Sequence, residues 1–380
     1  MDFFHSIEYL HGNRPYQLFE TLYPPLANLF FALIYRFMPP YATGKWTWSF
    51  RDSLKMRGTE NDLRIYQAPM LAFIVFIILC VLLIAGLTAW AVRNKPARTR
   101  YGIVFSVVCS FSMLFAFERG NILLLSWAMT LYYLLTYDHH RPFVRETGLI
   151  ALAAAAALKL YPAVFGLLLL REKRYRQAVR ALVYGILLTL LPCLCFDEGF
   201  RGLGIWLNVL LYKRNIFGMA VMDYSLKANV RLLFQALEDA YHIHVGKPAI
   251  LILSYLPAAA VLFSAFIAKE KWKALCAAAA AFLLIQPQSV YGMAFFLLPL
   301  LLVFREQDAF PRGSRLRIWV MILMNIHGPY LFAGVEYYLV LMNLLTMACV
   351  WDVIKWVHLR RTEKKEQAES ERMNKEQVCQ

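Results

Sequence analysis

The chain has 380 residues, of which 60% are hydrophobic and 15% aromatic, and its mean hydropathy is +0.48. Many apolar runs approach the length that crosses a bilayer, so the composition excludes an ordinary water-soluble protein and predicts a polytopic membrane protein. The formal net charge is +15, but the basic residues lie in short loops and in the tail, which is the positive-inside pattern and does not indicate nucleic-acid binding.

Apolar segments follow one another along most of the chain, and the fold class they predict is an all-α, polytopic transmembrane helical bundle. We expect about 10–12 membrane segments, some of them halves of short broken hairpins. The predicted segments are residues 22–38, 70–92, 101–117, 120–137, 147–158, 161–170, 179–196, 249–268, 274–286, 290–304, 318–334 and 337–357. Residues 1–357 are therefore predicted to form a single membrane domain, followed by a charged cytoplasmic tail at 358–380.

The first apolar segment, 22–38, opens with two prolines and is only marginally long enough to span. If it crossed the membrane, the basic residues at 93–100 would become external, against the charge rule. We therefore predict a re-entrant or surface helix here. The alternative is a further crossing within 39–69.

The basic loops predict the orientation of the segments. Lys and Arg residues are concentrated at 93–100, 171–180, 269–273, 305–317 and from Arg360 onward. All of these stretches are predicted to be cytoplasmic, because positively charged loops remain on that side.

The stretch 147–170 lies between two predicted cytoplasmic stretches, 138–146 and 171–180, so it must enter the membrane and return. Its apolar run is interrupted by Lys159 and Pro162. Proline lacks a backbone N–H and clashes with the preceding turn, so we predict that the chain turns back here.

Other polar turns are predicted on the same outer face. Residues 274–304 enter and return in the same way and turn at 286–289, and the turn at 118–121 also falls outside. Together with the predicted external regions 1–21 and 197–248, these turns are expected to converge on the non-cytoplasmic side.

Lys159 is the main candidate binding residue from the pattern alone. A cation within an apolar run is costly in lipid, and broken helices at membrane depth persist only where they are buried in protein or line a cavity. We predict that Lys159 and Tyr161 stand at a cavity that binds an anionic group. The alternatives are a lysine that reaches toward the interface and an ordinary interfacial tyrosine.

Five motifs together resemble the GT-C glycosyltransferases, and they are most similar to glycosyltransferase family 87, the polyprenyl-phosphate-mannose-dependent type. In chain order they are Asp2-Phe3-Phe4 with Gly12-Asn13-Arg14-Pro15-Tyr16 and Tyr23-Pro24-Pro25-Leu26; Glu118-Arg119-Gly120-Asn121; Leu158-Lys159-Leu160-Tyr161-Pro162; Tyr224-Ser225-Leu226 with Asn229 and Arg231-Leu232-Leu233; and Gln286-Pro287-Gln288-Ser289-Val290-Tyr291. The sequence departs from the family in three ways. A histidine usual after the last motif is missing, and Asp223 stands near the place where the family often has Asn-Gln. The helix that usually precedes the Asp-Phe element is either lost or truncated.

The resemblance implies an integral membrane enzyme of the plasma membrane. It would transfer a hexose, mannose in this family, from a polyprenyl-phosphate donor to a hydroxyl of a glycolipid, glycan or protein acceptor. The active site would face the non-cytoplasmic side. The sequence shows no metal-binding constellation, and no cofactor is predicted.

The resemblance also implies roles for individual residues. Asp2 occupies the place of the family's external-loop aspartate and is the candidate catalytic base; the alternative is a solvated N-terminal residue. The candidates for binding the donor phosphate are Lys159, Arg119, Tyr161 and Arg231. The candidates for binding the rest of the substrates are Asn121, Gln286, Ser289 and Tyr23. Asn121 is alternatively a helix cap, Arg119 an ion-pair partner of the neighbouring Glu118, and Arg231 a contact for lipid headgroups. Gln286 and Ser289 are alternatively ordinary turn residues.

Two other functions remain open from the sequence. Broken helices around a buried cation also occur in secondary transporters, although we find no aligned internal repeat between 147–170 and 274–304. A catalytically inactive relative that binds a lipid-linked sugar is the other alternative.

Overall fold

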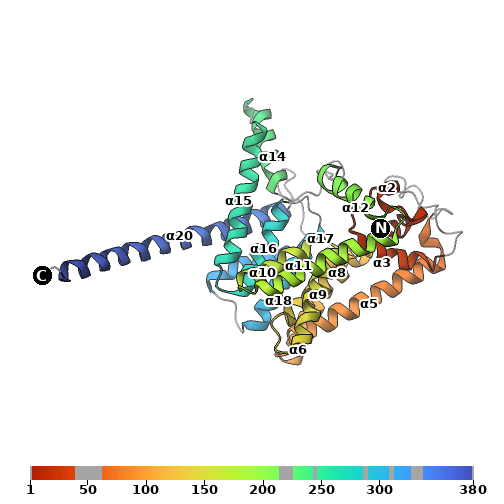
Figure 1. The fold of residues 1–380 in the computed structure, drawn as a ribbon, viewed down its shortest axis with the longest axis horizontal. Coiled ribbons are helices and arrows are strands. Elements are labelled where there is room, and N and C mark those ends of the chain that lie inside the picture. Colours follow the sequence, from red (N-terminus) through yellow and green to blue (C-terminus); the bar gives the residue numbers. More distant parts are fainter. Residues whose placement is uncertain are drawn as a thin grey trace.

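The computed structural model describes residues 2–38, 62–213, 226–242, 246–285, 290–307, 312–326 and 337–378 (Figure 1). Within these ranges the chain forms helices and no strand, so the predicted all-α class is confirmed. The α-helices are α1 (Asp2–Glu8), α2 (Pro15–Phe19), α3 (Pro25–Tyr35), α5 (Gln67–Ala91), α6 (Ala97–Val108), α7 (Phe111–Arg119), α8 (Leu123–Thr136), α9 (Pro142–Leu158), α10 (Leu167–Arg171), α11 (Tyr175–Leu190), α12 (Gly199–Asn208), α14 (Leu226–Tyr241), α15 (Lys247–Ile267), α16 (Lys271–Ile285), α17 (Val290–Met293), α18 (Leu297–Glu306), α19 (Arg315–Leu323) and α20 (Tyr337–Val378).

Short helices of other types connect or extend these elements. The 3-10 helices are η1 (His11–Asn13), η2 (Leu63–Ile65), η3 (Tyr161–Gly166), η4 (Leu191–Cys195), η7 (Ala294–Phe296) and η8 (Arg312–Ser314), and η5 (Val209–Lys213) is a π-helix.

Three helical stretches in the described part of the chain are long and apolar enough to cross a membrane: Gln67–Ala91, Tyr175–Cys195 and Tyr337–Glu363. Helices α6 and α7 form a fourth if the bent pair is counted as one span. Shorter apolar helices accompany them, such as α8 with 14 residues, which is less than the ~20 residues that a straight span needs. The protein is thus a helical membrane protein that combines full spans with short segments.

The predicted single segment at 101–117 is divided in two. Helices α6 and α7 meet at Cys109 and Ser110 at an angle of 53°, and Ser110 has an extended backbone. The backbone N–H of Phe111, which the break leaves without a helical partner, donates to the carbonyl of Asn325 at 2.9 Å. The Ser112 hydroxyl also donates to the Asn325 side chain. The turn that follows α19 thus supplies the hydrogen-bond partner for the broken backbone, which hydropathy alone does not reveal.

The predicted break in 147–170 is present at Lys159. Helix α9 ends at Leu158, Lys159 is extended with φ −154° and ψ 129°, and the chain continues through η3 and α10. Helices α8 and α9 pack together and are joined by the Ser126 hydroxyl, which donates to the carbonyl of Ala155 at 2.9 Å.

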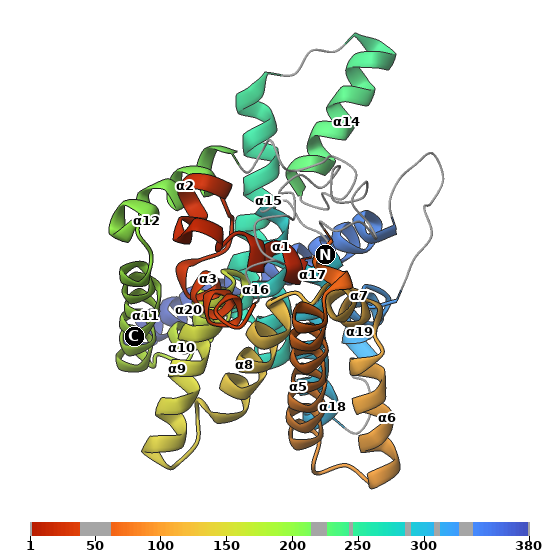
Figure 2. The same cartoon turned by 90° about the vertical axis from the view of Figure 1, so that its right-hand side faces the viewer.

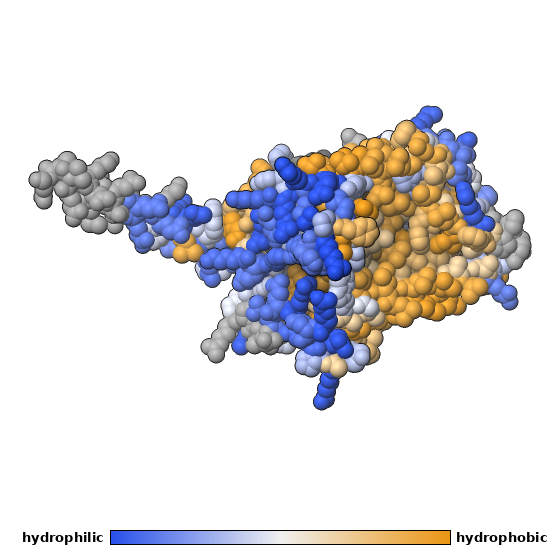
Figure 3. Space-filling view, turned by 60° about the horizontal axis from the view of Figure 1, so that its bottom comes forward, coloured by the Kyte–Doolittle hydropathy of each residue, from blue (hydrophilic) through white to orange (hydrophobic). Residues whose placement is uncertain are grey.

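The loops predicted to be cytoplasmic meet at one end of the bundle. The Lys271 ammonium lies 3.2 Å from the Asp138 carboxylate and 3.5 Å from that of Glu172. The Asn94 side chain donates to the carbonyl of Arg305 at 2.9 Å. Figure 3 shows a broad hydrophobic surface bordered by hydrophilic surface on the side toward the C-terminal helix.

The N-terminal helices pack against the segment around α12, and Figures 1 and 2 both show α2 beside α12. The Glu198 carboxylate accepts from the backbone N–H of Gln17 at 2.5 Å, at the start of α2. The Asn13 side chain donates to Asp197 at 2.7 Å, and the Trp206 indole donates to the carbonyl of Leu22 at 3.1 Å. The beginning of the predicted external region 197–248 is thus in contact with the N-terminal region.

The lengths of α3 and α20 bear on two predictions made from the sequence. Helix α3 has 11 residues, or roughly 16 Å, so it does not cross a bilayer by itself. Helix α20 continues without a break from Tyr337 to Val378, through the predicted boundary between residues 357 and 358. Its free end and α1 lie at opposite ends of the molecule (Figure 1).

Candidate active site

Asp2, Asn121 and Lys159 form a connected polar group although they are far apart in the sequence. The Asn121 amide donates to Asp2 Oδ2 at 2.5 Å, and the Lys159 ammonium donates to Asn121 Oδ1 at 3.2 Å. One amide side chain therefore connects the candidate base to the candidate phosphate-binding cation. The contacts are partly buried, where electrostatic interactions are stronger than in water.

Helix α1 holds Asp2 in place through its apolar face. Phe3, Phe4 and Ile7 are fully buried, and the Phe3 ring makes an edge contact with Phe31 of α3 at a centroid distance of 5.8 Å. Because these apolar side chains anchor the helix, Asp2 at its first position is directed to a defined place.

The turn after α7 presents Asn121. Gly120 ends the helix in the left-handed conformation, with φ +60° and ψ 41°, and the N–H of Asn121 donates to the carbonyl of Ala116 at 3.0 Å. This is the usual glycine-ended C-cap. Asn121 Oδ1 also accepts from the N–H of Leu123 at 2.9 Å, at the start of α8. Asn121 is thus both a helix cap and a neighbour of the charged groups.

Three tyrosine rings surround the Lys159 ammonium. Its nitrogen lies 5.1 Å from the ring centroid of Tyr291, 5.4 Å from that of Tyr161 and 5.7 Å from that of Tyr23. Aromatic faces attract cations at such distances, more strongly where water is excluded. The ammonium is therefore held within the protein, which argues against a lysine that simply reaches toward the interface.

Arg119 is the second cation of the site. Its Nη1 lies 4.0 Å from Asp2 Oδ1, and its guanidinium lies over the Phe115 ring at 4.6 Å. Its Nε is buried without a hydrogen-bond partner in the described structure. Glu118, the neighbouring carboxylate that offered an alternative explanation for Arg119, is exposed.

Tyr291 belongs to the site although sequence reasoning did not select it. Its hydroxyl donates to Asp2 Oδ2 at 2.5 Å, and its ring lies 4.9 Å from that of Phe115. Its sequence signal was its place as the last residue of the fifth motif, two positions after the predicted turn at 286–289. An aromatic residue at such a place is common in membrane proteins, so the signal was not specific.

Tyr23 is held beside Asn121 by contacts with neighbouring side chains. Its backbone carbonyl accepts from the Tyr16 hydroxyl at 3.0 Å, and its hydroxyl lies 3.5 Å from the Asn121 amide nitrogen. Burial raises the pKa of Tyr23 well above its ordinary value, and the nearby Asp2 carboxylate acts in the same direction. Tyr23 is therefore a neutral hydroxyl at physiological pH.

His5 lies on the second turn of α1. Burial lowers its pKa to about 4. The positive amino terminus, Arg119 and Arg64 lower it as well, while Asp2 opposes them. The imidazole is thus neutral at physiological pH, so His5 adds no positive charge to those of Lys159 and Arg119.

The structure thus brings together most of the predicted site residues: Asp2, Arg119, Asn121, Lys159, Tyr161 and Tyr23. Arg231 lies in α14, which projects from the bundle with α15 (Figures 1 and 2), and its side chain is outside the described residues. Gln286 and Ser289 also lie outside the described residues. No group of three or more His, Cys, Asp and Glu side chains in the described ranges is arranged to hold a metal ion.

Comparison with known proteins gives one match. The family model described as Glycosyltransferase family 87 matches residues 65–287, more than half of the chain. The matched range contains Arg119, Asn121 and Lys159, whereas Asp2 and Tyr291 lie outside it. No curated protein and no solved structure matches the chain.

Proposed function

The chain belongs to glycosyltransferase family 87 and is a membrane glycosyltransferase, and from this premise we propose that it transfers mannose from a polyprenyl-phosphate donor. The acceptor is a hydroxyl of a glycolipid, a glycan or a protein. The reaction takes place on the non-cytoplasmic face of the plasma membrane. The observation that carries the proposal is the Asn121 amide, which connects a carboxylate to an ammonium group.

Asp2 serves as the general base in this proposal. Its Oδ2 already accepts two hydrogen bonds, from Asn121 and Tyr291, and Oδ1 faces Arg119 at 4.0 Å. An acceptor hydroxyl that enters the site can donate to Oδ1, which is the geometry that a base requires. The two hydrogen bonds to Oδ2 hold the carboxylate in one orientation.

Lys159 and Arg119 bind the donor phosphate. The acceptor oxygen forms a bond to the anomeric carbon, and the bond from that carbon to the phosphate oxygen breaks. The electron pair leaves with the polyprenyl phosphate, and the acceptor proton passes to Asp2. Negative charge develops on the phosphate during this step, where fixed cations stabilise it.

Other predicted residues act on the substrates around this centre. The Tyr161 ring lies beside the Lys159 ammonium, and its hydroxyl is proposed to donate to the phosphate. Asn121, Tyr23, Gln286 and Ser289 are proposed to contact the sugar or the acceptor. Arg231 of α14 is proposed as a further phosphate contact, carried by an external helix.

The proposed orientation is supported by the distribution of basic loops. The site lies at the turn after α9, while Lys271, Arg171 and their partners lie at the opposite end of η3 and α10, roughly 20 Å away along these helices. Since basic loops remain in the cytoplasm, the site faces the other side.

The test uses the full-length protein in proteoliposomes with an acceptor extract. Labelled polyprenyl-phospho-mannose, polyprenyl-phospho-glucose and a nucleotide-mannose are compared as donors. We expect transfer from the lipid-linked mannose and none from the nucleotide sugar. Transfer from the nucleotide sugar alone would contradict the proposal that the donor is lipid-linked. A preference for the glucose donor would contradict the proposal that the transferred sugar is mannose.

The role of Asp2 is tested in the same assay. Asp2→Asn is expected to lower the transfer rate about 10²–10⁴-fold, as for other general bases. Glu118→Gln, which removes an exposed carboxylate on α7 near the site, is expected to leave the rate unchanged. Equal rates for the wild type and Asp2→Asn would remove Asp2 from the mechanism.

A further inference from the structure

Helix α7 is anchored at one end and leads into the candidate active site at the other. It begins at Phe111, directly after the break from α6, and ends at Arg119, roughly 12 Å further along its axis. Arg119 faces Asp2, and Asn121 follows two residues later. Because backbone hydrogen bonds make a helix stiff, a displacement of the first turn of α7 also displaces the end that forms the site.

The first turn of α7 is held by Asn325, in the turn that follows α19. The backbone carbonyl of Asn325 accepts from the N–H of Phe111 at 2.9 Å, and its side-chain oxygen accepts from the Ser112 hydroxyl. Ser112 and Asn325 are buried, with exposed fractions of 0% and 5%. An N–H that a break leaves free within an apolar stretch needs such a partner, because lipid offers none. Asn325 therefore attaches α7 to the turn after α19.

Asn325 is itself fixed by two other helices. Its side-chain nitrogen donates to the carbonyl of Met321 at 3.0 Å, in the last turn of α19. The next carbonyl along the chain, that of Ile326, accepts from the Tyr338 hydroxyl of α20 at 3.1 Å. Both ends of the Asn325 amide are thus hydrogen-bonded. The turn is therefore a fixed point to which α7 is attached.

The face of α7 that Asn325 holds also carries the second cation of the site. Ser112, Phe115 and Arg119 follow one another at i, i+3 and i+7, so they lie along one side of the helix. The Arg119 guanidinium lies over the Phe115 ring at 4.6 Å, and that ring lies 4.9 Å from the ring of Tyr291. A rotation or shift of α7 would therefore move Arg119 within the site.

We propose that Asn325 is a positioning residue of the transferase, which fixes the depth and rotation of α7 so that Arg119 meets the donor phosphate. The proposal rests on the proposed function, in which Arg119 binds that phosphate. Asn325 acts through α7 and not on the substrates. Its effect is large because a displacement of a catalytic group by about 1 Å can cost about 10²-fold in rate.

The kinetic test measures kcat/KM for labelled polyprenyl-phospho-mannose, with full-length variants in proteoliposomes and the acceptor extract. Asn325→Ala keeps the backbone carbonyl but removes the side-chain hydrogen bonds, and it is expected to lower kcat/KM about 10–100-fold. Ser112→Ala removes only the side-chain bond to Asn325 and should give a smaller loss. Ser110→Ala is the matched control and should retain the wild-type value, because its hydroxyl donates to the carbonyl of Val107 in α6 at 2.8 Å.

A double-mutant cycle separates positioning from stability. Arg119→Ala alone is expected to lower kcat/KM about 10²–10³-fold, but less than about tenfold when Asn325→Ala is already present, because a displaced Arg119 contributes little. In the Ser110→Ala background, Arg119→Ala should cost as much as in the wild type. A variant that only reduces the folded fraction lowers both members of each comparison equally, so it leaves this ratio unchanged.

A distance measurement tests the same proposal without transfer. Nitroxide labels are attached through p-acetylphenylalanine at Glu118 of α7 and at Leu18 of α2, which are both exposed. Electron paramagnetic resonance then measures the distance between the two labels in the full-length protein. We expect Asn325→Ala to shift or broaden the distance distribution, and Ser110→Ala to leave it unchanged.

Two results would overturn the role of Asn325. An Arg119→Ala effect of the same size in the wild-type and Asn325→Ala backgrounds would show that Asn325 contributes only to stability. An unchanged distance distribution in Asn325→Ala would show that α7 keeps its position without this side chain. Transfer that does not depend on Arg119 at all would instead contradict the proposed function, and the distance measurement would still decide whether Asn325 positions α7.

Discussion

The Asp2 carboxylate and the Lys159 ammonium are hydrogen-bonded to the same side chain, the amide of Asn121, at 2.5 and 3.2 Å. The amide nitrogen can only donate and its oxygen can only accept, so each end matches one charge. This arrangement keeps a base and a cation apart but at a constant separation. It suits a reaction in which a proton is taken at one point while negative charge develops at another.

Asn121→Ala is expected to lower kcat of mannosyl transfer about 10–100-fold. The variant removes one hydrogen bond to each charged group, and such bonds contribute about 1.5–3 kcal/mol each. The measurement is transfer from labelled polyprenyl-phospho-mannose at saturating donor. Asn94→Ala is the control, because Asn94 contacts Arg305 at the other end of the bundle. An unchanged kcat for Asn121→Ala would show that the bridge has no role in the reaction.

Lys159→Ala is expected to lower kcat/KM about 10²–10³-fold, the usual effect of removing one group that stabilises transition-state charge. Lys159→Arg should restore part of the loss, since it keeps the charge but changes the geometry. Steady-state kinetics in proteoliposomes give both values. Lys271→Ala, which removes a cation at the opposite end, should retain wild-type kinetics. Similar losses in the Lys159 and Lys271 variants would point to stability rather than catalysis.

Tyr291→Phe is expected to lower kcat about tenfold with little change in stability. The hydroxyl that orients Asp2 is lost, while the ring beside Lys159 and Phe115 remains. The comparison is with Tyr132→Phe, which removes a hydroxyl bonded to Thr147 elsewhere in the bundle. If Tyr291→Phe is fully active, Asp2 does not depend on this hydrogen bond.

Gly120→Ala is expected to destabilise the protein by about 1–3 kcal/mol and to reduce transfer. Gly120 has φ +60°, and an added Cβ would lie 2.8 Å from both Phe3 Cβ and Phe73 Cε2. Thermal unfolding in detergent measures the effect. Gly102→Ala in α6 is the control, since its Cβ would meet nothing within 4 Å. It should be neutral or slightly stabilising, because alanine is the better helix former.

The stability of the N-terminal region is expected to fall in acid because of His5. Its folded pKa of about 4 is below the ordinary value of 6.5, so protons bind the unfolded state more readily. The stabilisation is complete above pH 6.5 and is lost as the pH falls toward 4, by roughly 1–3 kcal/mol. Unfolding temperatures between pH 7.5 and 4.5 measure it.

His5→Gln should therefore lose less stability over this pH range than the wild type. His11→Gln, at an exposed position near Tyr35, should follow the wild-type pH dependence. An identical acid dependence for His5→Gln and the wild type would show that another group causes the loss.

The fold class and the family of this protein follow from its sequence. The apolar segments predicted an all-α membrane bundle, and five short motifs identified glycosyltransferase family 87. The cost of placing Lys159 in lipid, together with the basic loops, led to the prediction that the polar turns at Asn121 and Lys159 gather with the N-terminus. These predictions rest on hydropathy and charge, which each residue carries into any fold.

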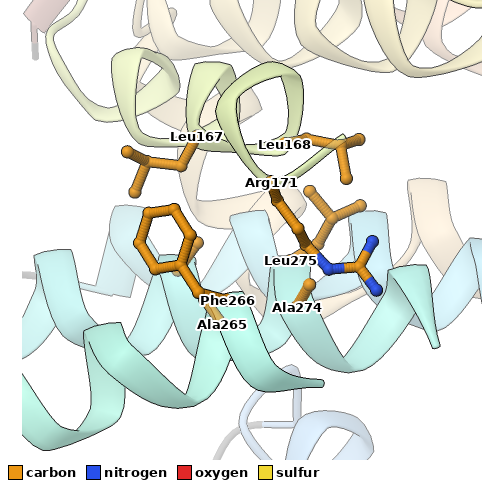
Figure 4. A pocket seen from close by; sticks show the side chains of 8 residues that line it. Leu167, Leu168, Arg171, Ala265, Phe266, Ala274 and Leu275 are labelled. Atoms are coloured by element: carbon orange, nitrogen blue, oxygen red, sulfur yellow. The ribbon is translucent and has the colours of Figure 1, made fainter. Parts of the chain in front are cut away.

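Only the tertiary structure decided which residues contact one another within the site and between the helices. The Tyr291 hydroxyl meets Asp2 across 289 positions of the sequence, and Asn325 supplies the carbonyl that stabilises the break before Phe111. The narrow apolar crevice between α10, α15 and α16 likewise depends on which alanine residues lie opposite α10 (Figure 4). Hydropathy shows that a residue is buried but not which residue it faces. Such partners depend on how helices rotate and cross when they pack, and that is a property of the whole bundle.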